Sequence, residues 1–260
     1  MDDNKVIDTA VDCFFGLATS TISVLRPSLG IVAIATSPIL AERVKEWLKQ
    51  WVNEGKMTSR EYSRLSDGID SMAETLQHNC GATDIRTDDL VKTNNDGFCD
   101  ADDVFEMMLN QIKQDSEKKK AHFSGNFIGN ILYAKDLDYS ELMQYGRVIG
   151  QISYSEMCLI RNFYSQYKER IVSFTNAERY IKRNDDPAAG KILSEVLHLR
   201  NLGLLHNSPP FNMGENIGNV MLSFYGIRLY DLLRLDLLDA KDVNKSLGDL
   251  WRVTRYMEKQ

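Results

Sequence analysis

The sequence predicts a mainly α fold, with a helical N-terminal region and a C-terminal winged-helix-like module that contains one short β ribbon. Over most of the chain, apolar residues recur every three or four positions, which is the spacing of amphipathic helices. Capping-box patterns at 58–61 and 153–156 mark two helix starts. The alternation that is typical of a strand is convincing only at Val220, Leu222 and Phe224.

The clearest stretch runs from Asp186 to Asp231. Asp186 followed by Pro187 is a helix start signal, an N-cap with proline in the first turn. An apolar stripe near period 3.6 follows, residues 206–210 interrupt it, and helical spacing resumes after the ribbon. Helix, turn, ribbon and helix is the order of a winged-helix module. We expect the leucines of this stretch to share one buried face with the helix over 157–164: Leu199, Leu202, Leu205, Leu222 and Leu229.

The polar stretch over 83–100 predicts a linker between an N-terminal helical region, 1–82, and a helical domain, 101–260. Its Asp and Asn residues invite comparison with a calcium loop, but Lys92 would occupy the first ligand position and Asp103 the twelfth. We therefore predict an acidic loop, a helix N-cap at Asp102 or Asp103, and no metal or other cofactor.

The apolar stretch 11–41 contains a single charge between Cys13 and Ala41, and Pro27 and Pro38 divide it into two pieces. Both pieces are shorter than the roughly 20 residues that a membrane-spanning helix needs. The pattern favours a hairpin buried in protein over one that enters a membrane. The candidate interface or membrane residues are Phe14, Phe15, Leu25, Ile31 and Ile34.

Charge and cysteine content indicate a compartment and argue against one class of partner. The chain has 260 residues and a net charge of −6; residues 1–100 carry 16 acidic and 10 basic residues, and residues 101–260 carry 21 of each. Neither part has the bulk positive charge of a nucleic-acid-binding protein. The four cysteines form no C-x-x-C pair, and the N-terminus is acidic, unlike a secretion signal, so a cytoplasmic location is expected.

Glycine spacing at Gly125 and Gly129 gives a G-x-x-x-G motif. This motif associates helices in membranes only within an apolar segment of about 20 residues, and Asn126 and Asn130 oppose that setting. A close crossing of two helices in a soluble domain, or a kink, is the preferred interpretation.

Several motifs of the second half resemble uncharacterised bacterial protein groups. These are Phe123-x-x-x-Phe127 after a lysine-rich segment, Leu199-x-x-Leu202-Gly203-Leu204-Leu205, and Leu222-Ser223-x-x-Gly226-x-x-Leu229. In the groups that they resemble, a helical segment leads into a winged-helix-like end, and members occur in prophages and defence neighbourhoods. The resemblance covers about half of the chain and implies no catalytic residues.

No catalytic or metal-binding motif is present: the histidines lack ligand spacing, and no nucleophile elbow, P-loop or dinucleotide fingerprint occurs. Duplex DNA binding by a winged helix requires cations near the reading helix and wing. The presumed wing, 211–219, has neither Lys nor Arg. The candidate nucleic-acid or partner contacts are Lys191, Arg200, Arg179, Lys182 and Arg183.

The sequence thus favours a non-enzymatic bacterial protein that binds a protein partner or itself, with phage–host conflict as the setting that the resemblance implies. A winged-helix DNA-binding regulator is the first alternative. A membrane-acting effector that uses residues 11–41 is the second.

Overall fold

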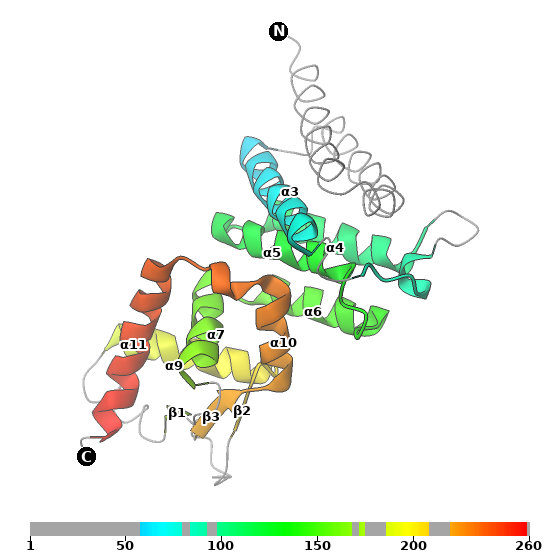
Figure 1. Cartoon of the computed structure of the whole chain (residues 1–260). Coiled ribbons are helices and arrows are strands. Elements are labelled where there is room, and N and C mark those ends of the chain that lie inside the picture. The colour runs from blue at the N-terminus through cyan, green and yellow to red at the C-terminus, as the bar shows by residue number, and fades with distance from the viewer. Residues whose placement is uncertain are drawn as a thin grey trace. The chain divides into compact units, whose positions relative to one another are not determined.

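The computed structural model describes residues 58–79, 84–92, 98–167, 172–174, 186–207 and 219–258. This part of the chain is mainly helical, as predicted. In chain order its elements are α3 (Ser59–Asn79), η1 (Asp89–Val91), α4 (Asp100–Gln114), α5 (Lys118–Ile131), α6 (Tyr139–Gln151), α7 (Tyr154–Tyr167), β1 (Val172–Ser173), α9 (Pro187–Asn201), β2 (Leu205–Asn207), β3 (Asn219–Leu222), α10 (Phe224–Leu233), η2 (Leu235–Leu237) and α11 (Ala240–Glu258) (Figure 1).

The chain divides into two compact units, Met1–Met143 and Gln144–Gln260. The stretch 83–100, predicted to be a linker, lies inside the first unit. Helix α3, from before that stretch, packs against α4 and α5, from after it. Within this stretch, Arg86 forms hydrogen bonds to the carbonyls of Leu132 and Ala134, at and after the end of α5. Polar composition is shared by linkers and by segments that form such hydrogen bonds, so composition alone does not distinguish the two.

Helices α3 and α5 approach closely at glycines. A Cβ atom added at Gly125 would lie 1.9 Å from the carbonyl oxygen of Gly68, and one at Gly129 would lie 2.9 Å from that of Met72. Because no side chain fits at these positions, the two backbones come into contact. The interpretation of G-x-x-x-G as a close helix crossing is confirmed.

Polar side chains pair along the same seam at a constant sequence offset. Thr75 Oγ1 donates to Asn126 Oδ1 at 2.9 Å, and Asn79 Nδ2 donates to Asn130 Oδ1 at 2.7 Å. One turn earlier, Ser71 Oγ bonds His122 Nδ1. Each step adds four residues on both helices, so α3 and α5 run parallel. The asparagine that opposed a membrane setting, Asn126, is buried but hydrogen-bonded, as buried amides must be.

Of two predicted helix starts, the one before α4 is wrong and the one before α7 is confirmed. Helix α4 begins at Asp100, earlier than expected, and Asp102 accepts the Cys99 N–H at 2.9 Å from within the first turn. An N-cap at Asp102 or Asp103 was therefore wrong. The capping box at 153–156 is confirmed: Glu156 accepts the Ser153 N–H at 2.6 Å and Ser153 Oγ accepts the Glu156 N–H at 3.2 Å.

Helix α7 forms the centre of the second unit. It contacts α9, α10, α11, η2 and β3, and its side chains Met157, Leu159, Ile160 and Phe163 are fully buried. Polar bonds also join it to α11 and the turn before it, such as Tyr154 Oη to Asp242 Oδ2 at 3.0 Å. The sequence prediction of a buried face on this helix is confirmed.

The sheet has three antiparallel strands in the order β1-β3-β2. Leu205 pairs with Leu222 across β2 and β3, and Val172 pairs with Val220 across β1 and β3. Only β3 was predicted, and it ends at Leu222, because Phe224 already begins α10. Strands of two and three residues are too short to show alternation, so β1 and β2 gave no sequence signal.

Candidate functional site

The predicted contact residues that the structure describes, Lys191 and Arg200, both lie on α9. The Asp186 carboxylate caps this helix by accepting the N–H groups of Ala188 and Ala189 at 3.0 and 3.2 Å, as the start signal predicted. The helix ends at Asn201, and Gly203 follows with φ +76, a conformation that suits glycine.

Most of the predicted leucine face is confirmed. Leu199, Leu205, Leu222 and Leu229 are buried, but Leu202 is only half-buried. Leu202 is the residue that caps the C-terminus of α9, where the chain leaves the helix, so its side chain no longer follows the buried stripe.

The opposite face of α9 is narrow and polar. Lys191, Ser194 and Asn201 are exposed, and Leu197 and His198 are half-buried at its edge. In a helix-turn-helix protein this is the face that enters the major groove, so its charge determines whether it can contact DNA.

Acids and a hydroxyl of the same unit bond to the basic side chains of this face. Lys191 Nζ lies 3.4 Å from Glu195 Oε1, one turn along α9, and donates to Ser155 Oγ of α7 at 3.3 Å. His198 Nδ1 lies 2.6 Å from the buried carboxylate of Glu156. A charge that is paired within the unit contributes little to neutralising a phosphate.

Arg200 differs from Lys191. It is half-buried, and it forms no ion pair with any residue that the structure describes. The structure therefore leaves one candidate cation of α9 without an acid. The other candidates lie outside the described residues. The candidate basic contacts among them are Arg179, Lys182 and Arg183, and the candidate hairpin residues are Phe14, Phe15, Leu25, Ile31 and Ile34.

An exposed aromatic side chain that sequence reasoning did not select lies at the first position of α10. Phe224 is 84% exposed, the largest exposure among the large hydrophobic residues described. The backbone beside it is held firmly: Ser223 Oγ donates to the Gly203 carbonyl at 2.6 Å and accepts the Gly226 N–H at 2.9 Å. A Cβ at Gly226 would lie 2.4 Å from the Leu204 carbonyl oxygen, so this end of α10 lies directly against the chain after α9.

Phe224 was missed because it was interpreted as a third inward residue of the strand. The available signal was Ser223, a good N-cap residue with a glycine three positions later, which places Phe224 outside the strand and at the start of a helix.

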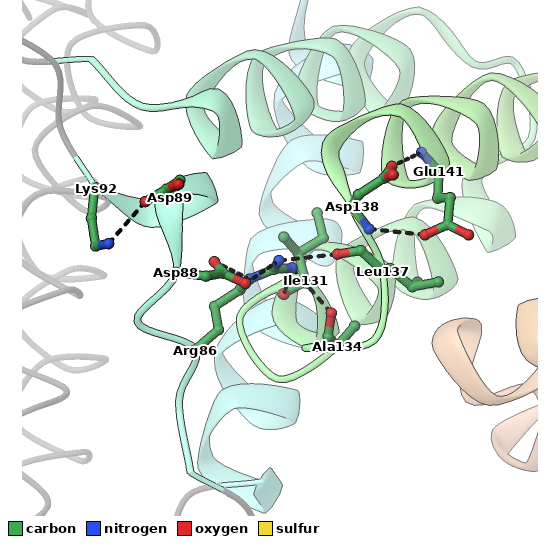
Figure 2. Close-up of polar contacts among 9 residues, drawn as sticks. All are labelled: Arg86, Asp88, Asp89, Lys92, Ile131, Ala134, Leu137, Asp138 and Glu141. Atoms are coloured by element: carbon green, nitrogen blue, oxygen red, sulfur yellow. Dashed lines mark hydrogen bonds and ion pairs between the residues drawn. The ribbon is translucent and has the colours of Figure 1, made fainter.

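A second polar cluster lies in the first unit, where Arg86 closes the end of α5 (Figure 2). The side chain is 3% exposed. Its Nη1 and Nη2 donate to the carbonyls of Ala134 and Leu137, both at 3.0 Å, and Nη1 also reaches the Ile131 carbonyl at 3.5 Å. Ile131 is the last residue of α5, whereas Ala134 and Leu137 belong to the loop that joins α5 to α6, so Arg86 ties that loop to the helix end.

Asp88 completes this cluster, because its carboxylate accepts from Arg86 Nε at 2.9 Å and from Nη2 at 2.6 Å. All five N–H groups of the guanidinium then have an acceptor. No donor remains for a phosphate or carboxylate ligand, so the cluster is a structural clasp. Beside it, Asp138 and Glu141 cap the start of α6 reciprocally, at 2.9 and 2.8 Å. The sequence offers Asp138 and Ser140 as cap residues for this helix, and Asp138 is the one that caps it.

We predict a pH dependence of stability from this clasp. The hydrogen bond from Arg86 lowers the pKa of Asp88 below its ordinary value of 3.8. A carboxylate with a lowered folded-state pKa stabilises the fold above its unfolded-state pKa, and that contribution disappears as the pH falls through the lower value. Asp88→Asn should lower the unfolding free energy at pH 7 by about 1 kcal/mol, because the carboxylate is half-exposed. Urea titrations at pH 7 and near pH 2 should show the two proteins converging at the acidic pH; a constant difference would contradict the ion pair.

The described ranges show neither a metal site nor a membrane-spanning helix. They contain no group of three His, Cys, Asp or Glu side chains that could hold a metal ion. Among the described helices, none combines the length and the apolar character that crossing a membrane requires. Comparison of the chain with protein-family models, with curated proteins and with solved structures found no match.

Proposed function

We propose that the unit Gln144–Gln260 is a winged-helix-like module that binds a protein partner or a second copy of the chain and catalyses no reaction. In a winged helix, a hairpin of two strands follows the reading helix. A short strand that comes before the reading helix pairs with the second strand of this hairpin. The order α7, β1, α9, β2, β3 and the sheet order β1-β3-β2 support this assignment. A fold of this kind can bind DNA or protein, so the choice between the two has to be argued from the charged and apolar side chains on its surface.

Phe224 is the observation that carries the proposal for a protein partner. An aromatic side chain that is 84% exposed on a fixed backbone loses little conformational entropy when it is covered, and it can bury a large apolar area. Its sequence neighbours at a spacing of three, Met221 and Ile227, are half-buried and can extend the contact. On α9, Lys191 is paired with Glu195 and His198 contacts Glu156, so Arg200 is the one candidate cation of this helix that has no acidic partner among the described residues.

Phe224→Ser should abolish partner binding and leave the fold intact. The measurement is capture from a lysate of the source cell with cross-linking, together with the solution mass of the purified protein, for wild type and variant. Leu237→Ser is the matched control, because Leu237 is a 45% exposed leucine of the same unit. Loss of a captured protein, or of self-association, in the Phe224 variant alone supports the proposal. Equal behaviour of both variants contradicts a contact at Phe224.

The net charge of the second unit favours the DNA-binding alternative. Residues 144–260 carry 16 basic and 13 acidic residues, a net of +3, whereas residues 1–143 carry 15 and 24, a net of −9. On α9, Lys191 is paired with Glu195, and Arg200 is the remaining candidate cation. We therefore still expect no submicromolar binding to random or genomic duplexes in a gel shift at low salt. Tight binding that weakens steeply with salt would favour a regulator instead.

A role in phage–host conflict completes the proposal. Its support is the resemblance of the motifs in the second half to prophage- and defence-associated bacterial groups, and the genes that neighbour this one provide the test.

A further inference from the structure

We infer that this chain associates with itself through two oppositely charged helix faces, the basic face of α11 in one copy and the acidic face of α3 in a second copy. The inference rests on the proposed interaction function and names the partner as a second copy. It concerns a surface separate from Phe224.

The basic face of α11 begins with two exposed lysines one turn apart, Lys241 and Lys245. Asn244 and Gly248 lie between and beyond them, both exposed, and a Cβ at Gly248 would meet nothing within 4 Å. Arg252 follows in the sequence at the same phase of the helical repeat. Among the described side chains of α11, the exposed charges are therefore the two lysines.

The acids of α11 are less exposed than its two lysines, although Asp249 lies one turn after Lys245. Asp242 faces α7, where it accepts the Tyr154 hydroxyl, and Asp249 is half-buried. Within the described residues neither Lys241 nor Lys245 forms an ion pair, in contrast to Lys191 on α9. Lys241 and Lys245 thus have no acidic partner in the described part of the chain, whereas Lys191 has one.

These lysines are placed unfavourably for the isolated helix. Like charges at i and i+4 destabilise a helix by a few tenths of a kcal/mol, and Lys241 lies in the first turn, where the helix dipole disfavours a cation. A local arrangement that costs stability, with no compensating contact inside the described unit, is typical of a binding surface. An anionic partner would remove both penalties.

Helix α3 presents the complementary arrangement. Asp70 and Glu74 are exposed one turn apart, and Asp67 lies one turn before them at 3.2 Å from Lys118. Partial burial, followed by the negative charges of Asp67 and Glu74, raises the pKa of Asp70. Each helix therefore carries a pair of like charges spaced by about 6 Å along its axis, with opposite signs on the two helices.

Charge balance favours a second copy over a nucleic acid as the occupant of the basic face. The first unit carries −9 and the second, which contains α11, carries +3, so the first unit repels a polyanion, whereas the first unit of a second copy is attracted to the second unit. A second copy offers the acidic pair at matching spacing. Because the two faces differ, the contact is head-to-tail and can extend to further copies.

Charge reversal tests this inference on the full-length protein. Light scattering and sedimentation at 50 mM salt should show a mass that rises with wild-type concentration and falls again at 500 mM salt. Lys241→Glu with Lys245→Glu, and separately Asp70→Lys with Glu74→Lys, should each weaken association about tenfold or more. An equimolar mixture of the two double variants should associate again, because the acidic α11 of one then faces the basic α3 of the other.

The matched control for the Lys241/Lys245 variant is Lys135→Glu with Arg147→Glu, which changes the net charge by the same amount at other exposed cations and should leave association unchanged. Circular dichroism verifies that every variant is folded. A wild-type protein that stays monomeric at all concentrations overturns the inference, as does a mixture that fails to recover, or a Lys241/Lys245 variant that loses DNA binding without any change of mass. If a monomeric protein still captures a partner through Phe224, the inference fails and the proposed function stands.

Discussion

Gly125→Ala should be among the most destabilising single substitutions in the first unit. The new Cβ would lie 1.9 Å from the Gly68 carbonyl oxygen and 2.8 Å from its carbon, and a backbone group cannot rotate away as a flexible side chain can. The helices must separate, which breaks the packing of α3 on α5 and stretches the polar pairs beside it. Overpacking of this kind costs about 3 kcal/mol or more.

Gly248→Ala provides the control for this substitution. Gly248 also lies in a helix, but its Cβ would meet nothing within 4 Å, so alanine should stabilise α11 by roughly 0.5–1 kcal/mol through helix propensity. Chemical denaturation of both variants, with hydrogen exchange to localise the change to α3 and α5, gives the comparison. A Gly125 variant as stable as wild type would show that the two helices do not touch at that point.

Leu199→Ala should be the corresponding severe substitution in the second unit. Leu199 lies on the buried side of α9 and its side chain is fully buried. Its removal leaves a cavity that the closely packed neighbouring side chains cannot fill. Buried leucine-to-alanine changes cost about 2–5 kcal/mol. Leu202→Ala should cost less than half as much, because Leu202 is half-buried at the end of the helix. Denaturant titrations that give Leu202 the larger effect would mean that α9 continues past Asn201.

Local sequence rules predicted the helical elements and most of their caps. Asp186 with Pro187, Ser153 with Glu156, and Asp138 each mark a start through bonds to residues two or three positions away, and that information is contained in the sequence itself. The meaning of Gly125 and Gly129 was also accessible, because small residues at a spacing of four permit close approach wherever a helix forms.

The features that could not be predicted depend on partners distant in the sequence. Lys191 was a candidate contact by type and position, but its bond to Ser155 comes from another helix, 36 residues away. Likewise, the polar stretch around Arg86 was interpreted as a linker because its acceptors, such as Ala134, lie 48 residues further on. Periodicity describes the buried side of each element, and it contains no information about which charges meet across elements.

The constant offset along the α3–α5 seam has a consequence for how the first unit folds. Each polar pair joins residues 51 apart, because two parallel helices require the chain to return to its starting end before they can meet. Contacts of such sequence separation raise the relative contact order above that of a bundle of neighbouring antiparallel helices, and folding slows accordingly. Loop closure must precede any stabilisation from the seam, so α3 gains its native partner only after α5 has formed. In a newly synthesised chain, the side of α3 that carries these polar residues therefore stays without its α5 partner until at least 51 further residues have been made, and during that interval it is most open to wrong partners.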